Sequence, residues 1–279
     1  MRIEAAALNL ADLGFQSGAV EPLVDSLFPV TPGWDLAGVV EQVGDGAAGF
    51  RPGDEVIGFV RDKAMHYGTN AEKISAEPRQ LVRKPKNLSW AQAAGLPVAG
   101  LTAYQAIVHS LGVTDGDTVL VHGAAGGVGH LAVQIALAQG AQVLGTGSQD
   151  SQAFIESLGA TPVRYGDELV EQVLKFAPDG VDAVLDTAGR GSLATTRALA
   201  APGARVASIT RSTEYEGTIG VYLRLDGDDF TRLVQLAEEG KLTVHVDRTF
   251  PLDQAAEAQR LLAGGHVRGK LVLENRTET

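Results

Sequence analysis

The sequence has no cysteine among its 279 residues. This absence excludes disulfides, thiolate nucleophiles and every zinc site that uses sulfur ligands. The six histidines do not replace the missing ligands, because they are scattered along the chain without the i,i+4 or His-x-His spacing of metal sites. We therefore expect no metal site.

Long apolar runs and clusters of basic residues are missing as well. No stretch approaches the roughly 20 apolar residues that a membrane-spanning helix requires. Acidic residues outnumber basic ones by 34 to 23, and no run of lysine and arginine offers a surface for phosphate backbones. We expect neither a membrane nor a nucleic acid as a partner. The early Glu4, without an apolar signal core behind it, predicts a cytoplasmic protein.

The secondary-structure pattern of the sequence changes near Pro97. Before it, short β-rich pieces such as residues 37–43 and 55–60 are bounded by Gly/Pro turns, which indicates a mostly β lobe. After it, apolar strands alternate with helices, which predicts βαβ units and a parallel sheet covered on both faces. The expected strands are 118–122, 142–146, 181–186 and 205–209, and the expected helices include 130–139, one ending at Gly159 and one near 193–199. The pattern of the C-terminal residues 244–279 predicts a strand from Val244, a helix over 252–262 and a strand over 270–273.

A glycine-rich turn lies between the first of these strands and its helix. Residues 122–129 read His-Gly-Ala-Ala-Gly-Gly-Val-Gly, a Gly-x-Gly-x-x-Gly pattern with alanine in the first place. Such a turn lets the backbone approach a pyrophosphate, and the helix N-terminus offers N–H groups to it. A glycine turn without a ligand is the alternative. We assign to cofactor binding the residues Ala124, Ala125, Gly126, Gly127, Val128 and Gly129.

The end of the second strand indicates which nucleotide is bound. An acidic residue there would hold the ribose 2′-hydroxyl of NAD, but the chain has Gly147 and Ser148. These small, uncharged residues leave room for a 2′-phosphate and favour NADPH over NADH, although no arginine or lysine stands at the tip. Asp150 follows slightly later, and we expect it to cap the next helix.

Several motifs together carry a resemblance to a known family: residues 28–40, 53–56, 94–104 and 121–129, and the pair Gly269-Lys270. Over nearly its whole length the chain resembles the medium-chain dehydrogenase/reductase superfamily, in its zinc-free quinone oxidoreductase (zeta-crystallin-like) branch. The resemblance implies an α/β fold with NADPH as cofactor. A Rossmann domain with a doubly wound parallel sheet would span 97–244. A GroES-like, mostly β substrate domain would span 1–96 and 245–279, shortened at its N-terminus by the opening hairpin.

The resemblance also assigns roles to single residues. It places Asn9 beside the nicotinamide, where it would be catalytic, and Thr102 near the nicotinamide and its phosphate. It places Tyr165 at the adenosine 2′-phosphate and Lys270 near the cofactor phosphates. The alternatives are an Asn9 that only ties down backbone, a plain strand-end Tyr165 and an exposed surface Lys270.

Three further candidate site residues lie at or directly after the ends of predicted strands. Thr187, Ser208 and Thr210 come directly after strands 181–186 and 205–209 or at their ends, at the sheet edge where such folds bind ligands. We expect them to contact the cofactor. Tyr67 is a candidate proton donor, with a packing tyrosine as the alternative and water as the other proton source.

Zinc-dependent relatives carry Gly-His-Glu where this chain has Gly33-Trp34-Asp35. Without zinc to activate an alcohol, we expect hydride transfer from NADPH to an acceptor that is already polarised, a quinone or an α,β-unsaturated carbonyl. An enoyl reductase acting on thioesters is a variant. A cofactor-linked sensor with little catalysis is the other alternative, because segments 13–18 and 68–73 lack the tyrosines and arginine usual in the family. The resemblance also implies a homodimer formed through the edge of the Rossmann sheet, and the apolar run 218–223, which would be unsafe as an open edge, is the candidate for that edge.

Overall fold

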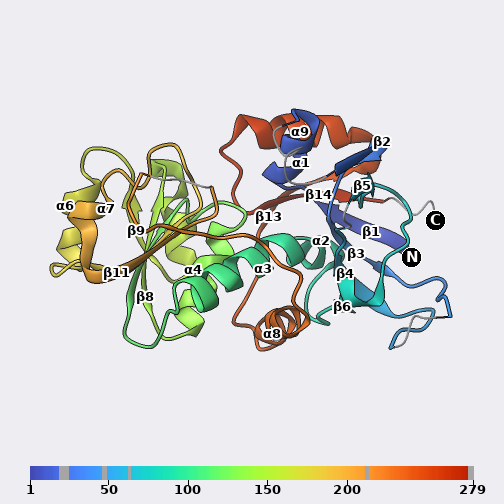
Figure 1. The fold of residues 1–279 in the computed structure, drawn as a ribbon, viewed down its shortest axis with the longest axis horizontal. Helices are drawn as coiled ribbons and strands as arrows, with labels where there is room; N and C mark the ends of the chain where they lie inside the picture. The colour runs from blue at the N-terminus through green and yellow to red at the C-terminus, as the bar shows by residue number, and fades with distance from the viewer. Residues whose placement is uncertain (19–24, 46–48, 62–63, 211–213, 276–279) are drawn as a thin grey trace. The chain divides into compact units, whose positions relative to one another are not determined.

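A computed structural model describes residues 1–18, 25–45, 49–61, 64–210 and 214–275. The chain forms two compact units (Figure 1). Unit 1 contains Met1–Val98 and Leu225–Thr279, and unit 2 contains Ala99–Arg224. This division differs from the expected one chiefly over residues 225–244. These residues cluster with unit 1 because helix α8 (Gly227–Glu238) packs against strand β6 (Leu81–Arg83), and the Asn87 side chain donates to the carbonyl of Ala237 at 2.6 Å.

In the described part of unit 2, six strands form one sheet in the order β12-β11-β10-β7-β8-β9, and every pairing is parallel. Numbered along the chain, this is the 3-2-1-4-5-6 order of a doubly wound dinucleotide-binding sheet, so the predicted fold class is confirmed. The strands are β7 (Thr118–His122), β8 (Gln142–Gly147), β9 (Thr161–Arg164), β10 (Val181–Asp186), β11 (Ala200–Ser208) and β12 (Ile219–Gly220).

The middle residues of the central strands, 119–121 and 183–185, are apolar and buried, as is typical of parallel strands that are covered on both faces. Leu120 and Val184 pack in one buried cluster with Val173 of the helix α6. Helix α4 lies against β7 and β8. The helical elements are α3 (Pro97–Tyr104), η2 (Gln105–Ser110), α4 (Gly129–Ala138), η3 (Gln149–Ser151), α5 (Gln152–Ser157), α6 (Leu169–Phe176) and α7 (Thr196–Leu199).

Of two expectations about helices in this unit, one is confirmed only in part and the other is wrong. The helix expected near 193–199 is limited to the four residues of α7. Asp150 does not cap α5, because the 3₁₀ turn η3 includes Asp150 and shifts the helix start to Gln152. Gln152 instead ties the helix to the preceding strand, since its side-chain amide donates to the carbonyls of Gly147 and Ser148.

In the described part of unit 1, six strands form a mixed sheet in the order β13-β14-β1-β3-β4-β6, with only β13 and β14 parallel. The tail of the chain therefore rejoins the N-terminal lobe. A separate parallel pair is formed by β2 (Asp25–Thr31) and β5 (Ala64–Tyr67). The other strands are β1 (Arg2–Ala7), β3 (Asp35–Val39), β4 (Glu55–Phe59), β13 (Val246–Pro251) and β14 (Lys270–Glu274).

Short helices complete unit 1, and two have well-formed N-terminal caps. Ser89 forms a reciprocal capping box with Gln92 at the start of α2 (Trp90–Ala94), and Asp226 caps α8. The remaining helical elements are α1 (Leu10–Gln16), η1 (Pro78–Gln80), η4 (Leu252–Gln254) and α9 (Ala255–Gly264). Among the helices of the described residues, none is long and apolar enough to cross a bilayer.

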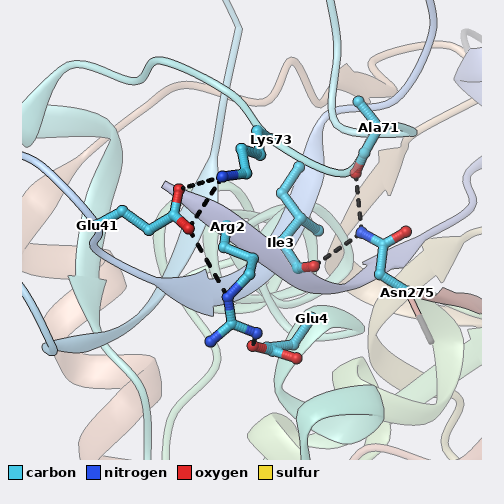
Figure 2. A network of polar contacts seen from close by, with 7 residues as sticks. All are labelled: Arg2, Ile3, Glu4, Glu41, Ala71, Lys73 and Asn275. Atoms are coloured by element: carbon cyan, nitrogen blue, oxygen red, sulfur yellow. Dashed lines mark hydrogen bonds and ion pairs between the residues drawn. The ribbon is translucent and has the colours of Figure 1, made fainter. Parts of the chain in front are cut away.

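A polar network fastens β1 to segments that are distant in the sequence (Figure 2). Glu41 forms ion pairs with Lys73 at 3.1 Å and with Arg2 at 3.9 Å. The side-chain amide of Asn275 donates to the carbonyls of Ile3 at 2.7 Å and Ala71 at 3.0 Å. β1 is thereby held between a loop of the N-terminal lobe and the end of β14.

Candidate functional site

In unit 2, the glycine-rich turn joins the end of β7 to the start of α4. The N–H of Gly126 donates to the carbonyl of Gly123 at 2.9 Å, and the N–H of Ala124 donates to Thr146 of β8 at 3.0 Å. A Cβ atom on Gly129 would lie 2.1 Å from the Gly123 carbonyl oxygen, so only glycine fits there. The third glycine of the motif therefore permits close packing of the helix on the strand. The N–H groups of His130 and Ala132 donate to the carbonyls of Gly126 and Val128 at 3.0 and 2.9 Å, so the first turn of α4 continues directly from the glycine turn.

His122 ends β7 beside the turn and is neutral at pH 7. Burial lowers its pKa to about 4, against the opposing effect of the nearby Asp186 charge. Its Nδ1 atom lies 3.4 Å from the Thr146 hydroxyl, and its Nε2 atom has no hydrogen-bond partner among the described residues. Thr187, one of the predicted cofactor contacts, donates its hydroxyl hydrogen to the His122 carbonyl at 2.7 Å.

Asp186, at the end of β10, organises the neighbouring loops. Its Oδ2 atom accepts hydrogen bonds from the hydroxyls of Ser208 and Thr210, both at 2.7 Å. Its Oδ1 atom accepts from the Ser192 hydroxyl at 2.6 Å and from two backbone N–H groups of the following turn. Burial alone would raise the pKa of Asp186, but these hydrogen bonds outweigh it and hold the pKa below its usual value. Ser208 and Thr210 thus order this sheet edge, and their contact with a cofactor stays a prediction.

The tip of β8 meets a cation that the sequence did not indicate. Gly147 pairs with Arg164 in the parallel register of β8 and β9. The exposed Arg164 guanidinium donates to Glu168 at 2.7 Å and to Gln149 at 3.4 Å. A Cβ on Gly147 would lie 2.6 Å from Ile155 Cδ1 and 3.1 Å from Ser151 Cβ, so a larger residue here would require these side chains to shift. Only the strand pairing, which links positions 17 residues apart, could have found Arg164.

These features fit the phosphate-bearing half of a nicotinamide nucleotide. The helix N-terminus behind a glycine turn suits a pyrophosphate, and the arginine beside an uncharged strand end suits a further phosphate. Tyr165 follows Arg164 and is 63% exposed, while Thr102 is buried on α3. Their cofactor contacts stay predictions.

Unit 1 contains a second polar cluster, made of Asn9, Asp12, Asp35 and Lys270. Lys270 is only 3% exposed, so the interpretation as a surface lysine is wrong. Its ammonium donates to the Asn9 side-chain oxygen at 2.6 Å and to the Leu8 carbonyl at 2.9 Å, and it lies 3.5 Å from Asp35 Oδ2. The residue predicted for the cofactor phosphates therefore has three acceptors within its own unit.

Asp35 links this cluster to the start of α3. Its Oδ1 atom accepts the backbone N–H of Val98 at 2.7 Å, and its Oδ2 atom accepts the Asn9 side-chain amide at 2.8 Å. Burial raises the pKa of Asp35, although Lys270 and these hydrogen bonds favour the charged form. The Asn9 side chain therefore bonds to the side chains of Asp35 and Lys270. These contacts contradict the alternative in which it only holds backbone groups in place.

Asp12, a further member of this cluster, titrates near neutral pH. Burial, together with the negative charge of Asp35, raises its pKa to about 7 against the effects of the Asn9 N–H bond and Lys270. The backbone N–H of Asn9 donates to Asp12 Oδ2 at 2.8 Å. Asp12 Oδ1 is buried without a hydrogen-bond partner among the described residues. Neither Asp12 nor the role of Asp35 was predicted from the sequence, although Asp35 lies inside the motif of residues 28–40.

Trp34 stands at the position where zinc-dependent relatives have a zinc ligand, and it makes an aromatic contact there. Trp34 is buried, packs edge-on against Phe59 at 6.3 Å between ring centroids, and lies under the Arg61 guanidinium. In the described residues, no three histidine, aspartate or glutamate side chains are grouped to hold a metal. Tyr67 is 71% exposed and stacks on His66, on the separate β2–β5 pair, so the structure does not group it with the Asn9 cluster.

A pocket of about 480 Å³ lies elsewhere in unit 1, beside the network of Figure 2. Charges of both signs line it, with Arg2 and Lys73 near Glu72 and Asp253. None of the predicted site residues borders it.

Substitutions in the turn should separate binding from packing. A Cβ on Gly126 would meet only the Gly123 carbonyl, at 3.2 Å, so we expect Gly126→Val to fold but to weaken nucleotide binding at least about tenfold by blocking approach of the pyrophosphate. Gly129→Ala should instead lower the free energy of unfolding, by about 3 kcal/mol, through its backbone clash. Calorimetric titration and thermal unfolding measure the two effects, and unchanged affinity in Gly126→Val would remove the turn from the site.

Asp12 should make the stability of unit 1 depend on pH. Because its pKa is about 7 in the folded protein and 3.8 ordinarily, unfolding releases a proton between these values. Stability should fall as pH rises from about 4 to 7, by at most about 4 kcal/mol, and level off above. Asp12→Asn should lose the part of this dependence that comes from Asp12 and keep any part that comes from Asp35, whose pKa is also raised, whereas exposed Asp228→Asn should keep it all. Both tryptophans, Trp34 and Trp90, lie in unit 1, so urea unfolding followed by their fluorescence at pH 5 and pH 8 makes the comparison. Equal pH dependence in all three proteins would contradict this prediction.

Two family models match the chain. The alcohol dehydrogenase GroES-like domain matches residues 1–86, and the zinc-binding dehydrogenase model matches residues 158–273. The first match lies within unit 1, whereas the second covers β9 to β12 of unit 2 and continues through α8 and β13 into β14 of unit 1.

Characterised relatives match almost the whole chain. The chain is 34% identical to a 2-methylene-furan-3-one reductase of Solanum lycopersicum, over 98% of its own length and 70% of the relative. It is equally similar to an NADPH-dependent alkenal/one oxidoreductase of Arabidopsis thaliana, of which it covers 71%. It is 31% identical to the quinone oxidoreductase of Homo sapiens, over 98% of this chain and 88% of the human protein.

Solved structures agree in fold. A structure described as an NAD-dependent alcohol dehydrogenase superposes with a TM-score of 0.91 at 32% identity, over 99% of this chain and 91% of the other. The quinone oxidoreductase from Coxiella burnetii gives a TM-score of 0.83 at 32% identity, over 99% and 89%. The fold, the glycine turn and the relatives agree: the chain belongs to the medium-chain dehydrogenase/reductase superfamily, in its zinc-free quinone oxidoreductase branch.

Proposed function

We propose that this oxidoreductase reduces a quinone or an α,β-unsaturated carbonyl with NADPH. The observation that carries the proposal is Trp34, buried in the place of a zinc ligand in a chain that has no cysteine. Without a zinc ligand set, the acceptor has to be polarised by its own conjugation. The names of the relatives, an alkenal/one oxidoreductase, a furanone reductase and quinone oxidoreductases, support this substrate class.

The bound nicotinamide supplies the hydride. The chain's own contribution is to bind and orient. The glycine turn and the N-terminus of α4 would hold the pyrophosphate, and Thr102, Thr187, Ser208 and Thr210 are proposed to line the cofactor further along. Asn9 would act at the nicotinamide end. For the proton we favour water over Tyr67, because the exposed tyrosine is not grouped with the Asn9 cluster.

The preference for NADPH over NADH rests on the tip of β8. Gly147 and Ser148 carry no acid to repel a 2′-phosphate, and Arg164 lies beside them through the β8–β9 register. Tyr165 is exposed next to this arginine. An arginine offers paired N–H donors that suit phosphate oxygens. One relative is named as NADPH-dependent, whereas one structural neighbour is described as NAD-dependent, so the choice depends on these local residues.

Removing the arginine tests the preference. Arg164→Ala should weaken NADPH binding about tenfold, which corresponds to about 1.4 kcal/mol, and change NADH binding less than about twofold. Arg197→Ala, an exposed arginine on α7, is the matched control. Fluorescence titration with both nucleotides measures the affinities. Equal losses for NADPH and NADH would show that Arg164 does not recognise the 2′-phosphate.

The reaction itself is tested by following NADPH absorbance with three panels of acceptors. We expect oxidation with quinones and with short enones or alkenals, and little with crotonyl thioesters. Activity mainly on thioesters would favour the enoyl reductase alternative. NADPH binding without oxidation by any acceptor would favour the sensor alternative and reject the reductase.

We also propose a homodimer through the free edge of the Rossmann sheet. β12 is the outer strand there, and its Ile219 is 41% exposed. An unpaired apolar edge strand is prone to pair with another strand.

A further inference from the structure

The carboxamide of Asn9 is held from two sides by groups of opposite character. The Lys270 ammonium can only donate, and it meets Asn9 Oδ1 at 2.6 Å. The Asp35 carboxylate accepts from Asn9 Nδ2 at 2.8 Å. Flipping the amide would place its NH₂ group against the ammonium and its oxygen against the carboxylate. The pair therefore selects one of the two orientations that an asparagine amide can adopt.

The fixed orientation leaves a defined donor. Asn9 Nδ2 carries two hydrogens, and Asp35 accepts one of them. The other hydrogen has no partner among the described residues, and Asn9 is only partly buried. Asn9 can thus offer a single N–H, in a set direction, to an oxygen acceptor of a bound molecule.

We propose that Lys270 and Asp35 are positioning residues that fix the Asn9 carboxamide for the nicotinamide end of the cofactor, and that Lys270 does not bind the cofactor phosphates. The proposal rests on the proposed function, because it takes Asn9 to act at that end. It differs from the role that the family resemblance implied for Lys270.

The surroundings of Lys270 argue against a phosphate ligand. Its ammonium has three hydrogens, and the three acceptors it meets are Leu8, Asn9 and Asp35. A phosphate would have to displace one of them. The side chain is 3% exposed and Asp35 is fully buried, so moving the ammonium outward would leave a buried carboxylate unpaired. The buried pair is therefore poorly suited to release its cation to a ligand.

A fragment of the cofactor distinguishes a positioning role of Lys270 from a phosphate-binding role. 2′-Phospho-ADP-ribose keeps all the phosphates of NADPH but lacks the nicotinamide. For Lys270→Met in the full chain, we expect fragment affinity to stay within about twofold of the parent. We expect NADPH affinity to fall about tenfold and the single-turnover rate of NADPH oxidation to fall at least as much. Equal weakening of fragment and NADPH, or no change in either, would overturn the proposal.

Coupling to Asn9 gives the second measurement. If Lys270 acts through Asn9, the variant Asn9→Ala/Lys270→Met should bind NADPH no worse than Asn9→Ala alone, within about twofold. Additive losses would mean that the two residues act independently and would contradict the proposal.

Two further variants control for stability. Lys270→Met leaves Asp35 buried without its cation, so Asp35→Asn/Lys270→Met removes both charges and should fold while still showing the selective NADPH loss. Lys84→Met is the matched control, because Lys84 is also a buried lysine of unit 1, paired with Glu55 at 3.5 Å. Lys84→Met should change neither the affinity for the fragment nor the affinity for NADPH. A selective NADPH loss in Lys84→Met as well would assign the effect to general loosening of unit 1.

These readouts are independent of the acceptor. If no quinone or enone is reduced, the fragment and NADPH affinities still decide the proposal. If the protein prefers NADH, the same comparison is made with NADH and ADP-ribose. Failure of the proposed function and failure of the positioning role are therefore separate results.

Discussion

The fully buried carboxylate of Asp35 is the constraint on which the candidate site of unit 1 depends. It accepts hydrogen bonds from the backbone of Val98 and the side chain of Asn9, and it pairs with Lys270. A buried carboxylate is costly unless its oxygens are satisfied, and breaking such a pair typically costs about 3–5 kcal/mol. The loop after β1, the start of α3, and strands β3 and β14 must therefore meet in one arrangement. The orientation of Asn9 is a consequence of that requirement.

Asp186 has the corresponding position in unit 2, but its partners are different in kind. Its donors are neutral hydroxyls and backbone N–H groups from the loops at the sheet edge, and they lower its pKa, whereas burial dominates at Asp35 and raises its pKa. A carboxylate satisfied by neutral donors fixes the loops, and among the described residues no ion pair compensates its negative charge. The glycine turn and Arg164 are the groups that we propose to attract phosphate in this unit. The two units thus use buried aspartates for one purpose, the ordering of loops, with different electrostatic results.

Local patterns allowed much of the fold to be predicted, and long-range pairings explain what was missed. The strand 118–122 matches β7, and the helix expected over 130–139 lies within one residue of α4, because an apolar run and a glycine turn specify them locally. The arrangement of Asn9, Asp35 and Lys270 joins residues 26 and 261 positions apart, which no periodicity reveals. Arg164 was missed because it depends on the register of two parallel strands, and the capping role of Asp150 was wrong because a 3₁₀ turn shifts the start of the helix.

Trp34 can stand in the place of a zinc ligand without disturbing the fold, because the neighbouring carboxylate of Asp35 has hydrogen-bond and ion-pair partners that do not involve a metal. Trp34 fills its position through contacts with Phe59 and Arg61, and Asp35 next to it remains bound to Asn9 and Lys270. Chemistry without a Lewis acid depends on dipoles that are already oriented before the reaction, since reorienting them during it would cost free energy. An amide fixed between a cation and an anion is such a dipole. The same motif that lacks the metal ligand therefore contributes, through Asp35, to the orientation on which a metal-free reduction would depend.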